Sequence, residues 1–255
     1  MLNRGNAKQY AKQALRRTVG EPYVGKRLKL RRLPRAMKTL DTPRSILDAG
    51  AEDATFVYWL ADRYPEAQVT AVDIDAAAIA ACLEARPSKY ADRVHFRVSY
   101  FADLEPGSFD LVTAFDVLEH IDDDLGAARD LYAALRPGGT LLVHVPRDRW
   151  LTRDGTVHRV PDEDAWQINA GHVRTGYSPE RMRALLTDAG FRVLDVQTWV
   201  GRWGTLAHSV YSRLEHPTPL RALSLPVTDV CAWLDARNPD MDGNTVFAWA
   251  EKPAR

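Results

Sequence analysis

Two short segments of the sequence carry residue types that can bind a nucleoside. Asp48-Ala49-Gly50-Ala51 follows one apolar run, and Val72-Asp73-Ile74 ends the next, one helix-length segment later. A carboxylate at the end of a strand can accept hydrogen bonds from both hydroxyl groups of a ribose, because it takes two donors at once. The spacing therefore predicts that Asp73 helps to bind an adenosine-containing ligand.

Other candidate residues for chemistry follow later in the chain. Asp116, Glu119 and His120 are spaced three and four residues apart, so they could share one helical face and offer oxygen and imidazole ligands to a metal. His172 is the candidate general base, because the ordinary pKa of histidine lies near neutral pH; the alternative is a surface or structural histidine. His144 lies within an apolar run and is expected to pack in the core.

Short apolar runs that alternate with helical patterns must position these side chains. The alternation predicts parallel strands with helices on both faces, which is a doubly wound α/β sheet. Asp75 and Ser178 are the predicted N-caps of two of the helices. Strands are expected at 45–49, 68–73, 94–98, 109–115, 140–145, 191–199 and 244–250, and helices at 56–64, 76–86, 123–135 and 179–190.

The chain is predicted to consist of a basic helical arm, residues 1–44, and one domain, residues 45–255. Within the domain, 146–177 interrupts the alternation and is interpreted as a small cap insertion, and 205–238 as a helical insertion broken by prolines such as Pro226. The arm carries 13 Lys or Arg against 2 acidic residues, although the whole chain has a formal net charge of zero. A solvated helical face that packs on the acidic remainder of the chain is the favoured interpretation of this arm, and binding of nucleic acid, an anionic lipid surface or an anionic substrate is the alternative.

Several ordered motifs together resemble the class I methyltransferases that use S-adenosylmethionine (SAM), particularly the small-molecule group. The resemblance covers about residues 45–200. The motifs are Ile46-Leu47-Asp48-Ala49-Gly50, Val72-Asp73-Ile74, Phe109-Asp110-Leu111-Val112, Val117-Leu118-Glu119-His120 and Leu135-Arg136-Pro137-Gly138-Gly139. The resemblance implies a Rossmann-like sheet of seven strands in the order 3-2-1-4-5-7-6, with the last strand antiparallel.

The resemblance also implies a binding site for SAM. Asp48, Ala49, Gly50 and Ala51 would line its methionine part, and Asp73 would bind the ribose. Ile74 and Phe101 would cover the adenine faces, although core packing is an equal alternative for both, and Tyr100 could stack on the base. Phe115 and Asp116 would lie near the sulfonium, and His172 stays the candidate catalytic residue. No metal is predicted, since Leu-Glu-His is common in this group without one.

The loop after the first strand departs from the pattern of the family. The positions of Glu52 and Ala54 are usually glycine there, the first so that the backbone can approach the cofactor closely. A carboxylate at Glu52 could repel the carboxylate of the cofactor, or point outward. The main prediction is SAM-dependent methyl transfer, and a non-catalytic binding or scaffold protein with this fold is the alternative.

The expected acceptor is an oxygen or nitrogen of a small molecule, of a glycan or of a secondary metabolite. Trp199, Trp203 and the apolar helices near them would suit a lipid-linked acceptor at a membrane, or a cap or homodimer interface. Nucleic acid is not expected as a partner. The glycine-rich motifs of nicotinamide enzymes and nucleoside-triphosphate enzymes are absent from the sequence. Two cysteines and the lack of a long apolar run predict a cytoplasmic protein.

Overall fold

The computed structural model describes residues 21, 23–152, 156–159, 171–213, 218–237 and 242–254. Residues 1–20 of the predicted basic arm and 160–170 of the predicted cap insertion lie outside the described residues. None of the described helices is long and apolar enough to cross a membrane.

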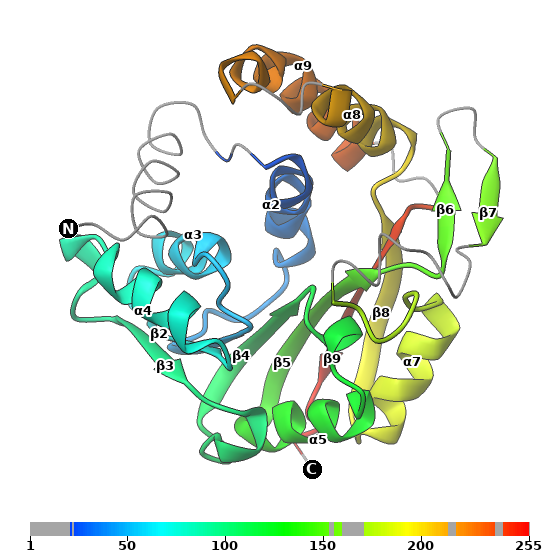
Figure 1. Ribbon diagram of the computed structural model, residues 1–255. Helices are drawn as coiled ribbons and strands as arrows, with labels where there is room; N and C mark the ends of the chain where they lie inside the picture. The colour runs from blue at the N-terminus through cyan, green and yellow to red at the C-terminus, as the bar shows by residue number, and fades with distance from the viewer. Residues whose placement is uncertain are drawn as a thin grey trace. The chain divides into compact units, whose positions relative to one another are not determined.

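Seven strands form one sheet in the order β3-β2-β1-β4-β5-β9-β8 (Figure 1). Because β8 and β9 are the sixth and seventh strands of this sheet along the chain, the predicted order 3-2-1-4-5-7-6 is confirmed. The strands are β1 (Ser45–Ala49), β2 (Gln68–Asp73), β3 (Val94–Val98), β4 (Phe109–Phe115), β5 (Leu135–Pro146), β8 (Arg192–Trp199) and β9 (Thr245–Glu251).

The first five strands are parallel, and the last one is not. β1 pairs in parallel with β2 and β4, β2 with β3, and β4 with β5. The apolar runs of β1 and β4 are buried on both faces, which explains why the sequence predicts them so closely, whereas the edge strand β3 alternates buried and exposed residues. β9 runs in the opposite direction, so the end of β9 lies beside the start of β5. Gly138, near the start of β5, donates its N–H to the carbonyl of Lys252, just beyond the end of β9 (2.7 Å).

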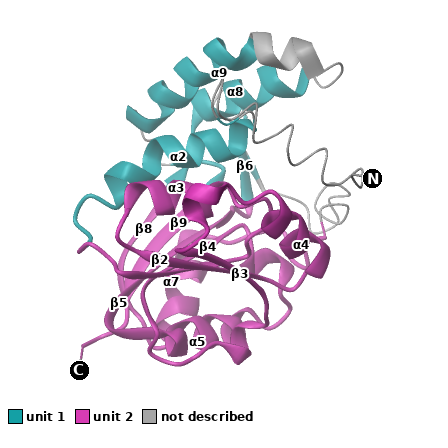
Figure 2. Ribbon diagram, turned by 90° about the vertical axis from the view of Figure 1, so that its left-hand side faces the viewer, with its two compact units in different colours: residues 1–40, 149–159, 198–245 teal, residues 41–148, 160–197, 246–255 magenta. Residues whose placement is uncertain are grey.

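Helices cover both faces of this sheet, as in a doubly wound fold. α5 (Asp124–Ala134) and α7 (Pro179–Asp188) pack together on one face, and α3 (Thr55–Arg63) and α4 (Ala76–Glu84) lie on the other (Figure 2). Two predicted N-caps are confirmed. Asp75 accepts a hydrogen bond from the N–H of Ala77 (2.8 Å), and Ser178 from that of Arg181 (3.1 Å).

Two predicted boundaries are wrong. β5 begins at Leu135 and not at residue 140, because Leu135 pairs with Phe109 and Lys252 bonds to the Gly138-Gly139 backbone, which keeps this turn within the sheet. Pro226 does not break the helical segment, since it lies inside α9 (Thr218–Arg237). A proline removes one intrahelical hydrogen bond. Packing of α9 against α8 (Arg202–Arg213) and α2 (Val24–Ala36) offsets that loss.

The chain divides into two compact units, which Figure 2 distinguishes by colour. Unit 1 comprises residues 1–40, 149–159 and 198–245. It contains α2, α8, α9 and the antiparallel hairpin of β6 (Arg149–Leu151) and β7 (Val157–Arg159). Unit 2 comprises residues 41–148, 160–197 and 246–255, and it contains β1 to β5. Unit 1 therefore unites most of the predicted arm with the predicted helical insertion.

Four basic side chains of α2 are buried, so the prediction of a solvated face is wrong for these residues, although Arg31 and Arg35 of the same helix are exposed. Lys26, Arg27, Lys29 and Arg32 are all buried. Arg32 forms an ion pair with Asp235 of α9 (2.8 Å), in which both side chains are buried. Arg27 donates hydrogen bonds to Oγ1 of Thr228 (3.1 Å) and to the carbonyl of Leu225 (3.0 Å). These contacts fix α2 within unit 1.

Candidate active site

The turn that follows β1 needs glycine at its first position. Gly50 has φ +92°, and a Cβ atom at this position would collide with Cγ2 of Val117. The N–H groups of Gly50 and Ala51 both donate to the carbonyl of Val72 in β2 (2.8 and 2.9 Å), which anchors the turn to the neighbouring strand. Just before the turn, Asp48 is buried and accepts a hydrogen bond from Oγ1 of Thr113 (2.5 Å).

Farther along the turn, two residues that are not glycine have the backbone conformation of glycine. The φ angles of Glu52 and Ala54 are +42° and +59°. For a residue with a side chain, the left-handed conformation costs roughly 1–2 kcal/mol. The backbone therefore follows the path that glycines would give it, at some expense in stability. Glu52 is exposed, so its side chain is not buried within the turn.

Asp73 at the end of β2 is fixed by backbone donors on both sides. Its Oδ2 accepts the N–H of Glu52 (3.1 Å), and its Oδ1 accepts the N–H of Asp75 (3.0 Å). A carboxylate oxygen has two lone pairs, so each oxygen keeps the capacity to accept a further hydrogen bond. The carboxylate is thus positioned before any ligand arrives, and it can still accept two hydroxyl donors.

Large apolar side chains are exposed beside this carboxylate. Ile74 and Tyr100 are 68% and 69% exposed, and Val98, whose backbone pairs in register with Asp73, is 54% exposed. Core packing, the alternative for Ile74, is therefore wrong. Phe101 does pack against the hydrophobic core of the sheet, since it is partly buried there. Exposed apolar side chains grouped in this way are typical of a ligand contact surface.

At the end of β4, Asp116 forms a hydrogen-bonded pair with a buried histidine. Nδ1 of His144 lies 2.7 Å from Oδ1 of Asp116, whose side chain stays 41% exposed. The parallel register places His144 beside Phe115, which brings the histidine to this position. The sequence predicts His144 only as a core residue, and although it is buried, it also orients Asp116. Phe115 itself is buried and contacts Phe56 edge to face, with ring centroids 4.9 Å apart.

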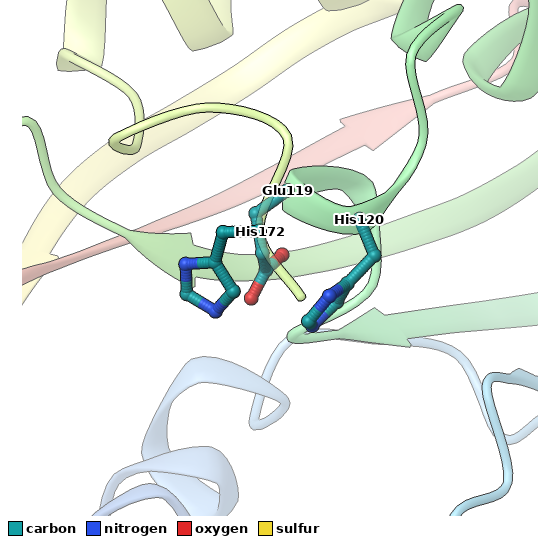
Figure 3. Close-up of side chains that lie close together, drawn as sticks. All are labelled: Glu119, His120 and His172. Atoms are coloured by element: carbon teal, nitrogen blue, oxygen red, sulfur yellow. The ribbon is translucent and has the colours of Figure 1, made fainter. Parts of the chain in front are cut away.

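Glu119, His120 and His172 come together from two segments of unit 2, and Figure 3 shows their side chains grouped. One ligand atom from each residue lies within 4.8 Å of the others. Asp116 does not share a helical face with Glu119 and His120, so that prediction is wrong. Asp116 has φ +57° and precedes a short 3-10 helix, η3 (Leu118–His120). The chain therefore turns sharply between Asp116 and this helix.

The environment of His172 favours its neutral form. Burial lowers the pKa of His172 below its ordinary value, the nearby His120 lowers it further, and Asp116 opposes both effects. The rings of His120 and His172 lie edge to face with centroids 4.7 Å apart. Near neutral pH, a histidine with a lowered pKa has an imidazole nitrogen that can accept a proton or bind a metal.

Comparison with known proteins adds evidence on the family. A family model of the methyltransferase domain matches residues 23–196. A stretch of 80 residues is 39% identical to the ubiquinone biosynthesis O-methyltransferase of Xanthomonas campestris pv. campestris (strain B100), covering 30% of this chain and 33% of that protein. The chain spans a quarter to a third of the length of the first curated relatives that it matches.

Solved structures share the fold at low sequence identity. Phosphoethanolamine N-methyltransferase 2 of Haemonchus contortus, in complex with SAM, has a TM-score of 0.67 and 20% identity, over 97% of this chain and 57% of that chain. The [4+2]-cyclase SpnF has a TM-score of 0.61 and 22% identity, over 89% of this chain and 82% of that chain. One architecture thus occurs in proteins named for different reactions.

Proposed function

We propose, from the premise that this chain belongs to the methyltransferase-domain family of class I SAM-dependent methyltransferases, that it moves a methyl group from SAM to an oxygen or nitrogen of a small molecule. Small metabolites and the sugar units of glycans or secondary metabolites are the proposed acceptors. The observation that supports the proposal most strongly is the fixed carboxylate of Asp73, with exposed apolar side chains grouped beside it.

The residues at the ends of β2 and β3 fit an adenosyl group. Asp73 has acceptor capacity for both ribose hydroxyls, since each of its oxygens accepts one backbone N–H from the described part of the chain. Ile74 and Tyr100 present apolar and aromatic surface that would be removed from water by an adenine ring. Burial of such surface contributes about 25 cal/mol per Å². These contacts would orient the nucleoside end of the cofactor.

The turn after β1 would hold the methionine end. Gly50 lets the chain turn tightly there against the side chain of Val117, and Asp48, just before the turn, is buried. The backbone N–H of Glu52 is directed to Asp73, and the side chain of Glu52 is exposed. The replacement of glycine by Glu52 therefore changes the surface of the turn but not the path of its backbone. Phe115 and Asp116, at the end of β4, are the proposed neighbours of the sulfonium, and His144 holds Asp116 in one orientation.

When bound, SAM supplies an activated methyl group, so the protein needs mainly to align the acceptor and to exclude water. For a hydroxyl acceptor, a base is needed to take the proton. His172, in the segment that precedes α7, is the proposed base. Its side chain is half-buried, and its ring lies beside the ring of His120. For an amine acceptor, the same imidazole would take the proton that the nitrogen loses.

A second candidate function is binding without catalysis. Glu52 and Ala54 stand where the family usually has glycine, and a cyclase shares the fold, so the architecture does not determine the reaction. Protein with SAM bound but without formation of S-adenosylhomocysteine would favour this second candidate. The predicted membrane contact of the basic arm, residues 1–44, a homodimer and a cytoplasmic location stay predictions.

Calorimetric titration of SAM into the purified protein tests the proposal. We expect saturable heat, and an Asp73→Asn variant should bind at least about tenfold more weakly, because it replaces a charged acceptor for two hydroxyls. Asp75→Asn is the matched control, because asparagine also caps helices and should leave the affinity unchanged. No heat or thermal shift at millimolar SAM would overturn the assignment. Formation of S-adenosylhomocysteine with phenols, carboxylates and amines then identifies the acceptor class.

A further inference from the structure

The side chains of Glu119, His120 and His172 form a cluster whose composition is that of a metal site. Glu119 and His120 belong to η3, and His172 comes from a distant segment of the same unit. Their ligand atoms lie within 4.8 Å of one another (Figure 3). Around one ion with bonds of about 2.1 Å, two ligand atoms are at most about 4.2 Å apart. Small side-chain rotations would therefore bring all three atoms into one coordination sphere.

Backbone contacts hold the two segments of the cluster together. The N–H of Val173 donates to the carbonyl of Glu119 (2.9 Å), and Nδ1 of His120 lies 3.0 Å from the carbonyl oxygen of Gly171. Each contact joins η3 to the residues on either side of His172. The ligand groups thus face one another before any ion is present, which lowers the entropy lost on binding.

The contact between His120 and Gly171 also determines which imidazole nitrogen can bind an ion. A carbonyl oxygen only accepts, so Nδ1 of His120 must carry the proton and donate it. The lone pair is then on Nε2. Metal-binding histidines commonly donate their second ring N–H to a carbonyl or carboxylate, which fixes the tautomer and the ring orientation. His120 already has this arrangement.

We propose that Glu119, His120 and His172 bind one divalent transition-metal ion of the Zn²⁺ type. Two imidazoles and one carboxylate match the ligand sets of zinc sites with an open position, whereas Mg²⁺ prefers oxygen ligands. The buried carboxylate of Glu119 also favours a cation, since a neighbouring positive charge offsets its desolvation. Asp116 is not part of the set, since only Glu119, His120 and His172 are grouped with ligand atoms within 4.8 Å of one another among the described residues, and Oδ1 of Asp116 pairs with His144.

The proposed metal site does not require that the protein transfers methyl groups, because its three ligands are assigned from the distances between their ligand atoms. Three protein ligands leave coordination positions for water or for an oxygen of a small molecule. One consequence rests on the proposed function. With the ion bound, His172 would be a ligand and could not act as the base. The ion would instead activate an acceptor hydroxyl, because coordination lowers the pKa of that hydroxyl.

Direct metal binding tests the proposal. The full chain, without a histidine tag, is treated with a chelator, dialysed and titrated with ZnCl₂ and separately with MgCl₂ in a calorimeter, with no SAM or acceptor present. We expect one Zn²⁺ per chain and much weaker binding of Mg²⁺. His120→Asn and His172→Asn should each lower the Zn²⁺ affinity by more than about 100-fold, since even an outer partner of a ligand is worth 10- to 100-fold.

His95→Asn is the matched control, because His95 is exposed on β3 and bonds only to Gln68 among the described contacts. It should keep the parent affinity. A Co²⁺-loaded sample should show visible absorption that the two cluster variants lose, while their circular dichroism stays unchanged. Absence of Zn²⁺ binding at millimolar concentration, or equal affinity in the parent and both cluster variants, would overturn the site. SAM binding in the same samples would be unaffected by that outcome, so the two proposals fail separately.

Discussion

The backbone N–H of Glu52 lies 3.1 Å from Oδ2 of Asp73, so a loop residue that is not glycine helps to fix the carboxylate at the end of β2. The same residue has a left-handed backbone, with φ +42°. The turn after β1 and the acid after β2 therefore form one structural element. Substitutions that move the backbone of the turn should affect both folding stability and cofactor binding.

Gly50→Ala should destabilise the protein by more than the strain of its φ angle alone. At φ +92° the new Cβ would also collide with Cγ2 of Val117. Gly107→Ala is the control, because Gly107 has φ +66° but no atom within 4 Å of an added Cβ. We expect a loss of about 1 kcal/mol for Gly107→Ala and at least about twice that for Gly50→Ala, measured by urea unfolding. Equal losses would show that the Val117 contact does not matter.

Glu52→Gly should raise the free energy of unfolding. Relief of the left-handed strain contributes roughly 1–2 kcal/mol, and the greater flexibility of glycine in the unfolded chain removes about 0.4–1 kcal/mol of that gain. Because Glu52 is exposed, no buried area is lost. Urea unfolding should show a gain of up to about 1.6 kcal/mol. SAM affinity should be retained, since the backbone N–H that Asp73 accepts is still present; a weaker affinity would contradict this account.

Asp235→Ala should destabilise unit 1 strongly. The ion pair with Arg32 is buried on both sides, with 7% and 1% side-chain exposure, and Asp235 also accepts the N–H of Gly204 (2.9 Å). Removal of one partner of a buried pair typically costs about 3–5 kcal/mol, because the other charge stays buried.

The exposed pair of Arg31 and Asp229, which joins the same two helices, is the control for that prediction. Both of its side chains are more than 40% exposed. Asp229→Ala should therefore cost less than about 1 kcal/mol. Thermal unfolding of both variants, followed by circular dichroism, measures the difference. Similar melting temperatures for the two variants would contradict the importance of burial.

Acid should destabilise the protein through His208. Burial, together with the nearby positive charge of Lys29, lowers the pKa of His208 to about 4. Above pH 6.5 the residue is neutral in both states and contributes nothing. Between about pH 6.5 and 4 the unfolded chain binds a proton that the folded chain does not, so stability falls with pH, by up to about 3 kcal/mol. Below pH 4 the loss levels off.

His208→Gln lacks this proton and should lose less stability over the same pH range. Urea unfolding of both proteins at pH 7 and at pH 4.5 measures the two losses. The parent should lose more than the variant. An equal loss in the two proteins would show that other groups cause the acid sensitivity.

The sheet could be predicted from the sequence because its parallel strands are short apolar runs, buried on both faces in β1 and β4 and on alternate residues in the edge strand β3. The runs at β1, β3 and β4 have the predicted bounds. The start of β5 could not be predicted, since Pro137-Gly138-Gly139 is a typical turn and only its pairing with Phe109 and Lys252 keeps it in the sheet. Local composition predicts local structure, and this pairing joins residues that are far apart in sequence.

The candidate site could be predicted only in part, for the same reason. Asp73 lies where a strand-end acid was expected, and its backbone donors follow from the turn. The approach of His172 to His120 depends on contacts between segments about fifty residues apart. Likewise, the sharp turn at Asp116 directs its carboxylate to His144 instead of to a helical face. The positive φ of Asp116 leaves no signal in the sequence.

Unit 1 is assembled from three segments, and its buried ion pair joins residues 203 positions apart. During synthesis on the ribosome, α2 emerges early, but its partner helix α9 does not exist until most of the chain has been made. The buried cations of α2 must therefore stay hydrated in the nascent chain. Contacts of such high sequence separation form slowly, because a long loop must close first. We expect unit 1 to acquire its native structure late, after β1 to β5 have already been translated.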